Sequence, residues 1–210
     1  MSTEKGYLLV VDDIPDILKL LDATLKFKGY RVVLARDGQE ALDAIQQERP
    51  ALIVTDILMP KMDGFSLVHS LRLNPETRDI PVIFLSATYV APEDKAFALT
   101  IGVTRFIEKP VDFEKFLPTV EELLTKGAPA APEPLNEIDF YEGYRKRLEK
   151  KLSHKITQIA RDERLLETLS EEEKPSFEAS LRLAINEREE IQRLLVQLRK
   201  RANNSPKQPR

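Results

Sequence analysis

Residues 7–124 alternate short apolar runs with longer amphipathic stretches. The apolar runs have the length and composition of buried β-strands, and they cover residues 7–11, 32–34, 51–54 and 81–85. The more polar stretch 104–107 is the fifth predicted strand. After each run, apolar residues recur every three or four positions, as they do on one face of a helix. This repeated β-α alternation predicts an α/β domain built on a doubly wound, five-stranded parallel sheet.

Turn and capping signals bound the helices that this pattern predicts. Pro15 suits the first turn of the first helix, and Gly29 and Gly102 suit positions just after two helix ends. Pro50 and Pro75 end two other helices, because proline cannot continue a helical ladder. The predicted helices cover about residues 15–27, 38–49, 65–73, 93–101 and 113–124.

The C-terminal third of the chain has a different pattern. Residues 127–137 form a Pro- and Ala-rich linker, which we expect to be extended and semi-rigid. Apolar residues then recur at helical spacing over residues 138–201, with an interruption at 170–176 and a coiled-coil-like heptad seam in the second half. We expect an antiparallel helical hairpin there, followed by a disordered tail at 202–210.

A lone hairpin leaves one apolar face exposed to water. We therefore expect the hairpin over 138–201 to form a homodimer or to dock on a partner protein. Two long helices lack the short recognition helix of the common DNA-binding motifs, so we do not expect DNA binding. Residues 138–210 hold 17 Lys and Arg against 13 Asp and Glu, a modest net charge of +4.

Composition excludes several further classes of protein. The chain has no cysteine, so a disulfide framework or a thiolate metal site is excluded. No apolar run approaches the ~20 residues needed to span a bilayer. The first residues lack the basic and apolar regions of a signal peptide. We therefore expect a cytoplasmic protein with no membrane contact.

Four of the predicted strands end on side chains that carry chemistry. Asp12 and Asp13 follow the first strand, Asp56 follows the third, Ser86 follows the fourth, and Lys109 follows the fifth. The carboxyl ends of parallel strands share one edge of the sheet. We therefore expect three carboxylates, a hydroxyl and an ammonium in one site. These groups suit a divalent cation and a phosphoryl group.

These residues lie in four motifs that resemble the receiver domain of two-component response regulators. The motifs are Asp12-Asp13, Asp56 with Met59-Pro60 and Met62-Asp63-Gly64, Ser86-Ala87, and Lys109-Pro110. The resemblance extends from residue 5 to about residue 125, and we take residues 1–126 as the receiver domain. It implies the flavodoxin-like strand order 2-1-3-4-5, with the acidic site at the carboxyl edge of the sheet.

The resemblance also implies the central reaction. Asp56 would accept a phosphoryl group from the phosphohistidine of a cognate histidine kinase or phosphotransfer protein. Asp13 and Asp56 would bind Mg²⁺ directly, Asp12 would bind it through water, and Leu58 through its backbone carbonyl. The protein would thus catalyse its own phosphorylation without being a dedicated enzyme.

The remaining motif residues would recognise the phosphoryl group and respond to it. Lys109 would pair with the phosphoryl oxygens, Ser86 would donate a hydrogen bond to one of them, and Ala87 would leave room for the group. The movement of Ser86 would free space into which Phe106 turns, which is the switch of the family.

Two positions bear on the lifetime of the phosphorylated state. Leu58 and Thr88 lie two residues beyond Asp56 and Ser86, where side chains flank the attacking water. Neither of them is an acid or an amide, so we expect slow autodephosphorylation.

The hairpin has an alternative interpretation as a phosphotransfer element. Residues 151–156, Lys-Leu-Ser-His-Lys-Ile, faintly resemble the phosphoacceptor helix of histidine kinase dimerisation domains, with His154 as the acceptor. The family places an acid where Lys155 stands and a proline where Ile159 stands. The chain would then be a phosphorelay intermediate. The other histidine, His69, has no ligand-like neighbours in the sequence.

Overall fold

The computed structural model describes residues 6–204 apart from 88, 90 and 171, with side chains up to residue 200. The chain divides between Leu135 and Asn136 into two compact units. Within the described part of the chain, no helix is both long enough and apolar enough to cross a membrane.

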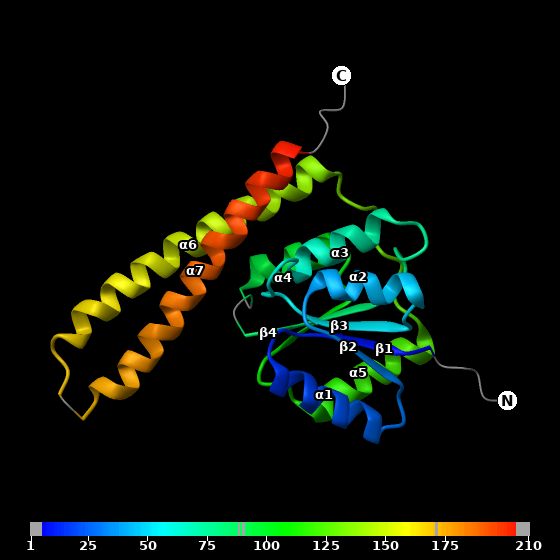
Figure 1. The fold of residues 1–210 in the computed structure, drawn as a ribbon, viewed down its shortest axis with the longest axis horizontal. Coiled ribbons are helices and arrows are strands. Elements are labelled where there is room, and N and C mark those ends of the chain that lie inside the picture. Colours follow the sequence, from blue (N-terminus) through cyan, green and yellow to red (C-terminus); the bar gives the residue numbers. More distant parts are fainter. Residues whose placement is uncertain (1–5, 88, 90, 171, 205–210) are drawn as a thin grey trace. The chain divides into compact units, whose positions relative to one another are not determined.

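The N-terminal unit is built on a five-stranded parallel sheet (Figure 1). Its strands are β1 Leu8–Val11, β2 Val32–Ala35, β3 Leu52–Asp56, β4 Val82–Ser86 and β5 Arg105–Glu108. Their order is β2-β1-β3-β4-β5, and every neighbouring pair is parallel. The predicted flavodoxin-like sheet is confirmed.

Helices cover both faces of the sheet, with α1 and α5 on one side and α2, α3 and α4 on the other (Figure 1). Their bounds are α1 Pro15–Phe27, α2 Gly38–Gln47, α3 Gly64–Leu73, α4 Pro92–Thr100 and α5 Phe113–Lys126. Each end lies within two residues of its predicted position. Aspartate side chains set three of the starts, because Asp37, Asp63 and Asp112 accept backbone N–H groups at the N-termini of α2, α3 and α5.

The two faces of the sheet carry separate cores. On the α1 and α5 side, a buried cluster includes Val10, Val54 and Leu85 from the three central strands. On the other side, the Phe84 ring meets the ring of Phe65 edge-on, with their centroids 5.3 Å apart. Successive side chains of a strand point to opposite faces, so a sheet covered on both sides needs apolar residues throughout. In β1 and in β3 up to Val54 every side chain is apolar, and in β4 the first polar side chain is that of its last residue, Ser86.

The C-terminal unit is a helical hairpin of α6 Glu137–Leu166 and α7 Lys174–Asn204, which lie side by side (Figure 1). The Asn136 side chain caps α6 by accepting the N–H of Asp139. Ile159, Leu181 and Ala184 form a buried cluster between the helices. An ion pair crosses the seam, with Lys155 Nζ 2.7 Å from Glu187 Oε2.

The structure moves two boundaries in this unit. Helix α7 begins at Lys174, inside the predicted interruption, so Pro175 lies in its first turn. Proline is tolerated there because the first N–H groups of a helix have no partner within the helix. Helix α7 also continues to Asn204, past residue 202 where the disordered tail was expected to begin. Residues 205–210 lie outside the described part of the chain.

Candidate functional site

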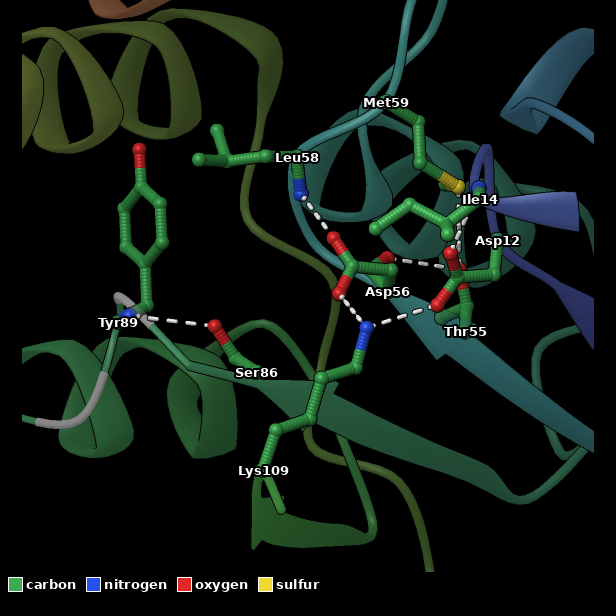
Figure 2. A network of polar contacts seen from close by, with 9 residues as sticks. All are labelled: Asp12, Ile14, Thr55, Asp56, Leu58, Met59, Ser86, Tyr89 and Lys109. Atoms are coloured by element: carbon green, nitrogen blue, oxygen red, sulfur yellow. Dashed lines mark hydrogen bonds and ion pairs between the residues drawn. The ribbon is translucent and has the colours of Figure 1, made fainter. Parts of the chain in front are cut away.

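The strand register brings the predicted site residues to one edge of the sheet. Val11 pairs with Thr55 in the register of β1 and β3, and Asp56 pairs with Leu85 in that of β3 and β4. Asp12, Asp56 and the residues after β5 therefore follow one another across the carboxyl edge. Figure 2 shows their side chains converging from separate strand ends.

The ammonium group of Lys109 lies at the centre of the site. Its Nζ is 2.7 Å from Asp12 Oδ2 and 2.6 Å from Asp56 Oδ1. The exposed fractions are 15% for the Lys109 side chain, 1% for Asp12 and 14% for Asp56. Burial lowers the pKa of Lys109, but the two carboxylates outweigh it and raise that pKa above its ordinary value. Lys109 is therefore a fixed cation.

The Asp56 carboxylate is held in one orientation and is hard to ionise. Its Oδ2 accepts the backbone N–H of Leu58 at 2.7 Å, while Oδ1 faces Lys109. Burial raises the pKa of Asp56 to about 6, and the nearby charge of Asp12 adds to the rise. Lys109 and the Leu58 N–H act in the opposite direction. The carboxyl is therefore mostly ionised at neutral pH, and contacts with Leu58 and Lys109 fix the orientation of both of its oxygens.

Asp13 completes the acidic group at the rim of the site. Its side chain is exposed. Partial burial and the charge of Asp12 both raise its pKa, while Lys109 lowers it. One ammonium therefore does not offset three carboxylates, and negative charge remains at the sheet edge.

The donor chemistry of this edge fits Mg²⁺. Asp12, Asp13, Asp56 and the Leu58 carbonyl offer oxygen ligands only, which hard divalent cations prefer. Burial first, and then the charge of Asp12, raise the pKa values of Asp13 and Asp56, and a cation next to these carboxylates would stabilise their ionised forms. Among the residues that the structure describes, no three His, Asp or Glu side chains form a ready-made metal cage. Lys109 stands between two of the predicted ligands instead.

Ser86 lies beside this group with its hydroxyl directed elsewhere. The Ser86 Oγ is buried and accepts the backbone N–H of Tyr89 at 3.1 Å. Figure 2 shows the hydroxyl turned toward Tyr89. The neighbouring Ala87 is exposed, and Thr88 lies outside the described residues.

Phe106 on β5 is half-buried beneath a lysine of α4. Its ring lies edge-on to Phe84, with centroids 6.4 Å apart. The Nζ of Lys95 lies 5.7 Å from the centre of the Phe106 ring, and Lys95 also pairs with Glu108. The ring therefore packs against the α4 side of the sheet, next to the site.

Several features of the site were not visible in the sequence. The Lys109-Pro110 peptide bond is cis, and Lys61 has a φ of 58°. His69 is buried, with its Nε2 2.9 Å from the carbonyl oxygen of Leu135, although we expected no ligand-like neighbour for it. Gly64 belongs to one of the sequence motifs, but the sequence did not reveal why glycine is needed there. The need is steric, because a Cβ at this position would lie 2.5 Å from the Asp56 carbonyl oxygen.

Comparison with known proteins agrees with this geometry. The family model of the response regulator receiver domain matches residues 8–121, more than half of the chain. The chain belongs to the response regulator receiver family. The receiver domain is therefore the N-terminal unit of the chain, and it places the protein in a two-component system. Receiver domains generally bind Mg²⁺ at their phosphorylation site.

Individual relatives match the same part. The transcriptional regulatory protein GlrR of Escherichia coli K12 is 37% identical over 138 residues, which are 65% of this chain and 30% of GlrR. The receiver domain of a histidine kinase from Syntrophus aciditrophicus is 36% identical, with a TM-score of 0.54 over 58% of this chain and 91% of its own. The chemotaxis regulator CheY4 of Vibrio cholerae is 34% identical, with a TM-score of 0.53 over 56% and 98%. The chain thus spans under a third of GlrR.

The raised pKa of Asp56 predicts a pH-dependent effect of its replacement. Between about pH 4 and 6 the folded state keeps a proton that the unfolded chain releases, so this carboxyl lowers stability as the pH rises through that window. We expect Asp56→Asn to raise the free energy of unfolding at pH 7.5 by up to about 3 kcal/mol, at about 1.4 kcal/mol per pKa unit. The gain should disappear near pH 4.

Urea unfolding followed by circular dichroism, in EDTA, measures this effect. Asp43→Asn on the exposed face of α2 is the control, and it should change stability little at either pH. An equal gain for Asp56→Asn at both pH values, or none at pH 7.5, would show that the pKa of Asp56 is not raised.

Proposed function

We propose that the chain is a response regulator that accepts a phosphoryl group on Asp56 from a phosphohistidine donor. The donor is a cognate histidine kinase or phosphotransfer protein in the cytoplasm. One observation carries the proposal, which is the partly buried Lys109 ammonium placed 2.6 Å from Asp56 and 2.7 Å from Asp12. That cation stands where a phosphoryl oxygen needs a counter-charge, next to a carboxylate with a fixed orientation.

The residues perform the transfer mainly by position and charge. An ionised Asp56 oxygen attacks the phosphorus, the P–N bond of the donor breaks, and its electron pair stays with the imidazole nitrogen, which takes up a proton. The product is an acyl phosphate on Asp56. Lys109 then exchanges its contact with the carboxylate for the phosphoryl oxygens. With a pKa of about 6, Asp56 is mostly ionised at neutral pH, as a nucleophile must be.

Mg²⁺ is the cofactor that this donor set suits. Asp13, Asp56 and the Leu58 carbonyl would hold it directly, and Asp12 would hold it through water. The ion supplies positive charge that reduces repulsion between the carboxylates and the arriving phosphoryl group.

The switch uses the two side chains next to the site. Ser86 would leave the Tyr89 N–H and donate its hydroxyl to a phosphoryl oxygen, while the small Ala87 leaves that oxygen accessible. Phe106 would then turn inward and leave Lys95. The slow autodephosphorylation expected from Leu58 and Thr88 stays a prediction.

The hairpin is proposed as the output element, acting through dimerisation with a second copy. Its helices of 30 and 31 residues have the form of half of a four-helix bundle. Large apolar side chains remain exposed on it, among them Ile138, Ile156 and Leu183. The linker connects the receiver to the hairpin. His69 of α3 contacts Leu135, which lies in the chain shortly before α6.

The alternative is a phosphorelay intermediate that uses His154. The observation in its favour is that the His154 side chain is exposed on α6. However, Lys155, at the position of the usual acid, pairs with Glu187 and contacts Gln158. We therefore favour Asp56 as the sole acceptor. We propose no DNA contact, although GlrR is by name a transcriptional regulator.

Radiolabelled phosphoramidate, a small donor with a P–N bond, tests the acceptor. We expect Mg²⁺-dependent labelling of the native chain and of His154→Ala, and no labelling of Asp56→Asn. Label that survives in Asp56→Asn but is lost in His154→Ala would identify the relay instead. An unlabelled native chain would contradict the proposed function.

Multi-angle light scattering tests the output. We expect beryllofluoride with Mg²⁺, which mimics the phosphorylated Asp56, to raise the dimer fraction of the full chain. Asp56→Asn should not respond to it. A chain whose mass stays that of a monomer at all concentrations, with and without the mimic, would contradict dimerisation through the hairpin.

A further inference from the structure

We propose that Lys61 is a positioning residue for phosphoryl transfer, because its ion pair with Asp37 ties the loop after Asp56 to the start of α2. The inference rests on the proposed function and adds a residue to it. The loop in question is residues 57–63, between β3 and α3, and we call it the acceptor loop.

Asp37 is a rigid anchor for this loop. Its Oδ1 accepts the backbone N–H groups of Gln39 and Glu40, both at 2.9 Å. Its Oδ2 is 2.7 Å from the Nζ of Lys61. The Asp37 side chain is 2% exposed, whereas that of Lys61 is 63% exposed. A solvated lysine thus reaches down to a buried carboxylate whose other oxygen is already fixed by α2.

The backbone of Lys61 lies in the left-handed region, with φ at 58°. No other non-glycine residue in the described part of the chain has a positive φ. A lysine gains nothing from this conformation, and such strain persists only where the surroundings over-determine it. The Nζ of Lys61 lies 2.7 Å from Asp37 Oδ2 and 3.9 Å from Glu40 Oε1, and of these two ion pairs the shorter one, to the buried Asp37, is the one we take to hold the backbone there.

A second contact holds the next residue against the same helix start. The backbone N–H of Gly38 donates to the carbonyl of Met62 at 3.0 Å. A Cβ on Gly38 would lie 2.7 Å from Cγ of Met62, so only glycine allows this approach. The acceptor loop therefore lies against α2 at two successive residues, Lys61 and Met62.

We call the contacts of Lys61 and Met62 with the start of α2 the clamp. The clamp acts on Asp56 through the acceptor loop. The loop is closed at its base, where the N–H of Gly64 donates to the carbonyl of Ile57 at 2.8 Å. Within it, Leu58 donates its N–H to Asp56 Oδ2. The Gly64–Ile57 hydrogen bond fixes one side of the loop and the clamp fixes the other, so the backbone of Leu58 has little freedom to move. Without the clamp, Leu58 would direct the nucleophilic carboxylate less well, and small misplacements slow transfer strongly.

A set of variants at residue 61 separates charge from backbone conformation. We expect Lys61→Met to slow labelling of Asp56 at saturating phosphoramidate and Mg²⁺ by about tenfold. Lys61→Arg should restore most of the rate, because it keeps the ion pair. Lys61→Gly accepts the positive φ but lacks the cation, so it should stay slow. Lys26→Met, which breaks the exposed Lys26–Asp22 pair on α1, is the control and should label at the native rate.

Amide hydrogen exchange gives a readout that does not depend on phosphorylation. In Lys61→Met the amides of Leu58 and Met62 should exchange faster than in the native chain, while those of β1 stay unchanged. A native rate in Lys61→Met, or a native rate in Lys61→Gly, would overturn the proposal. If the native chain takes no label at all, the proposed function fails, and unchanged exchange at Leu58 would independently overturn the clamp.

Discussion

A partly buried ammonium shared by two carboxylates determines how this site works. Lys109 satisfies Asp12 and Asp56 at once, at 2.7 and 2.6 Å. A buried carboxylate without a counter-charge would be protonated at neutral pH and could not attack phosphorus. The pKa of Asp56 therefore reflects a balance, in which burial raises it and Lys109 lowers it to a value that still permits ionisation. The same cation is available to the phosphoryl group when that group arrives.

The parallel sheet makes this arrangement possible. Its five strands end at a common edge, so residues that are far apart in sequence, such as Asp12 and Lys109, become neighbours. Apolar packing on both faces fixes the strands, and a shift of register by one residue would move every side chain of a strand to the opposite face and into the wrong core. The sheet fixes where the reactive groups stand, and the loops after the strands give them their orientation. The acceptor loop, held between α2 and Asp56, is the clearest example.

The sequence predicted the sheet, and it predicted that Asp12, Asp56 and Lys109 would lie together at its carboxyl edge, for identifiable physical reasons. Apolar runs mark buried parallel strands, and Asp56, Ser86 and Lys109 stand out because each lies within two residues of the end of a predicted strand. Contacts that depend on the folded geometry were not predicted. Lys61 looks like any loop lysine in the sequence, and only the fold brings it to Asp37. The partner of Ser86 is a backbone N–H, which no residue type reveals.

The most direct test of the central claim is the titration of Asp56 by carbon NMR, with labelled aspartate carboxyls and no Mg²⁺. Signals are assigned by comparison with Asp56→Asn. The account predicts a midpoint near pH 6 in the native chain and a higher midpoint in Lys109→Met, while Lys115→Met, which breaks an exposed ion pair, leaves it unchanged. A midpoint near the ordinary value of 3.8, or one that does not move when Lys109 is replaced, would contradict it.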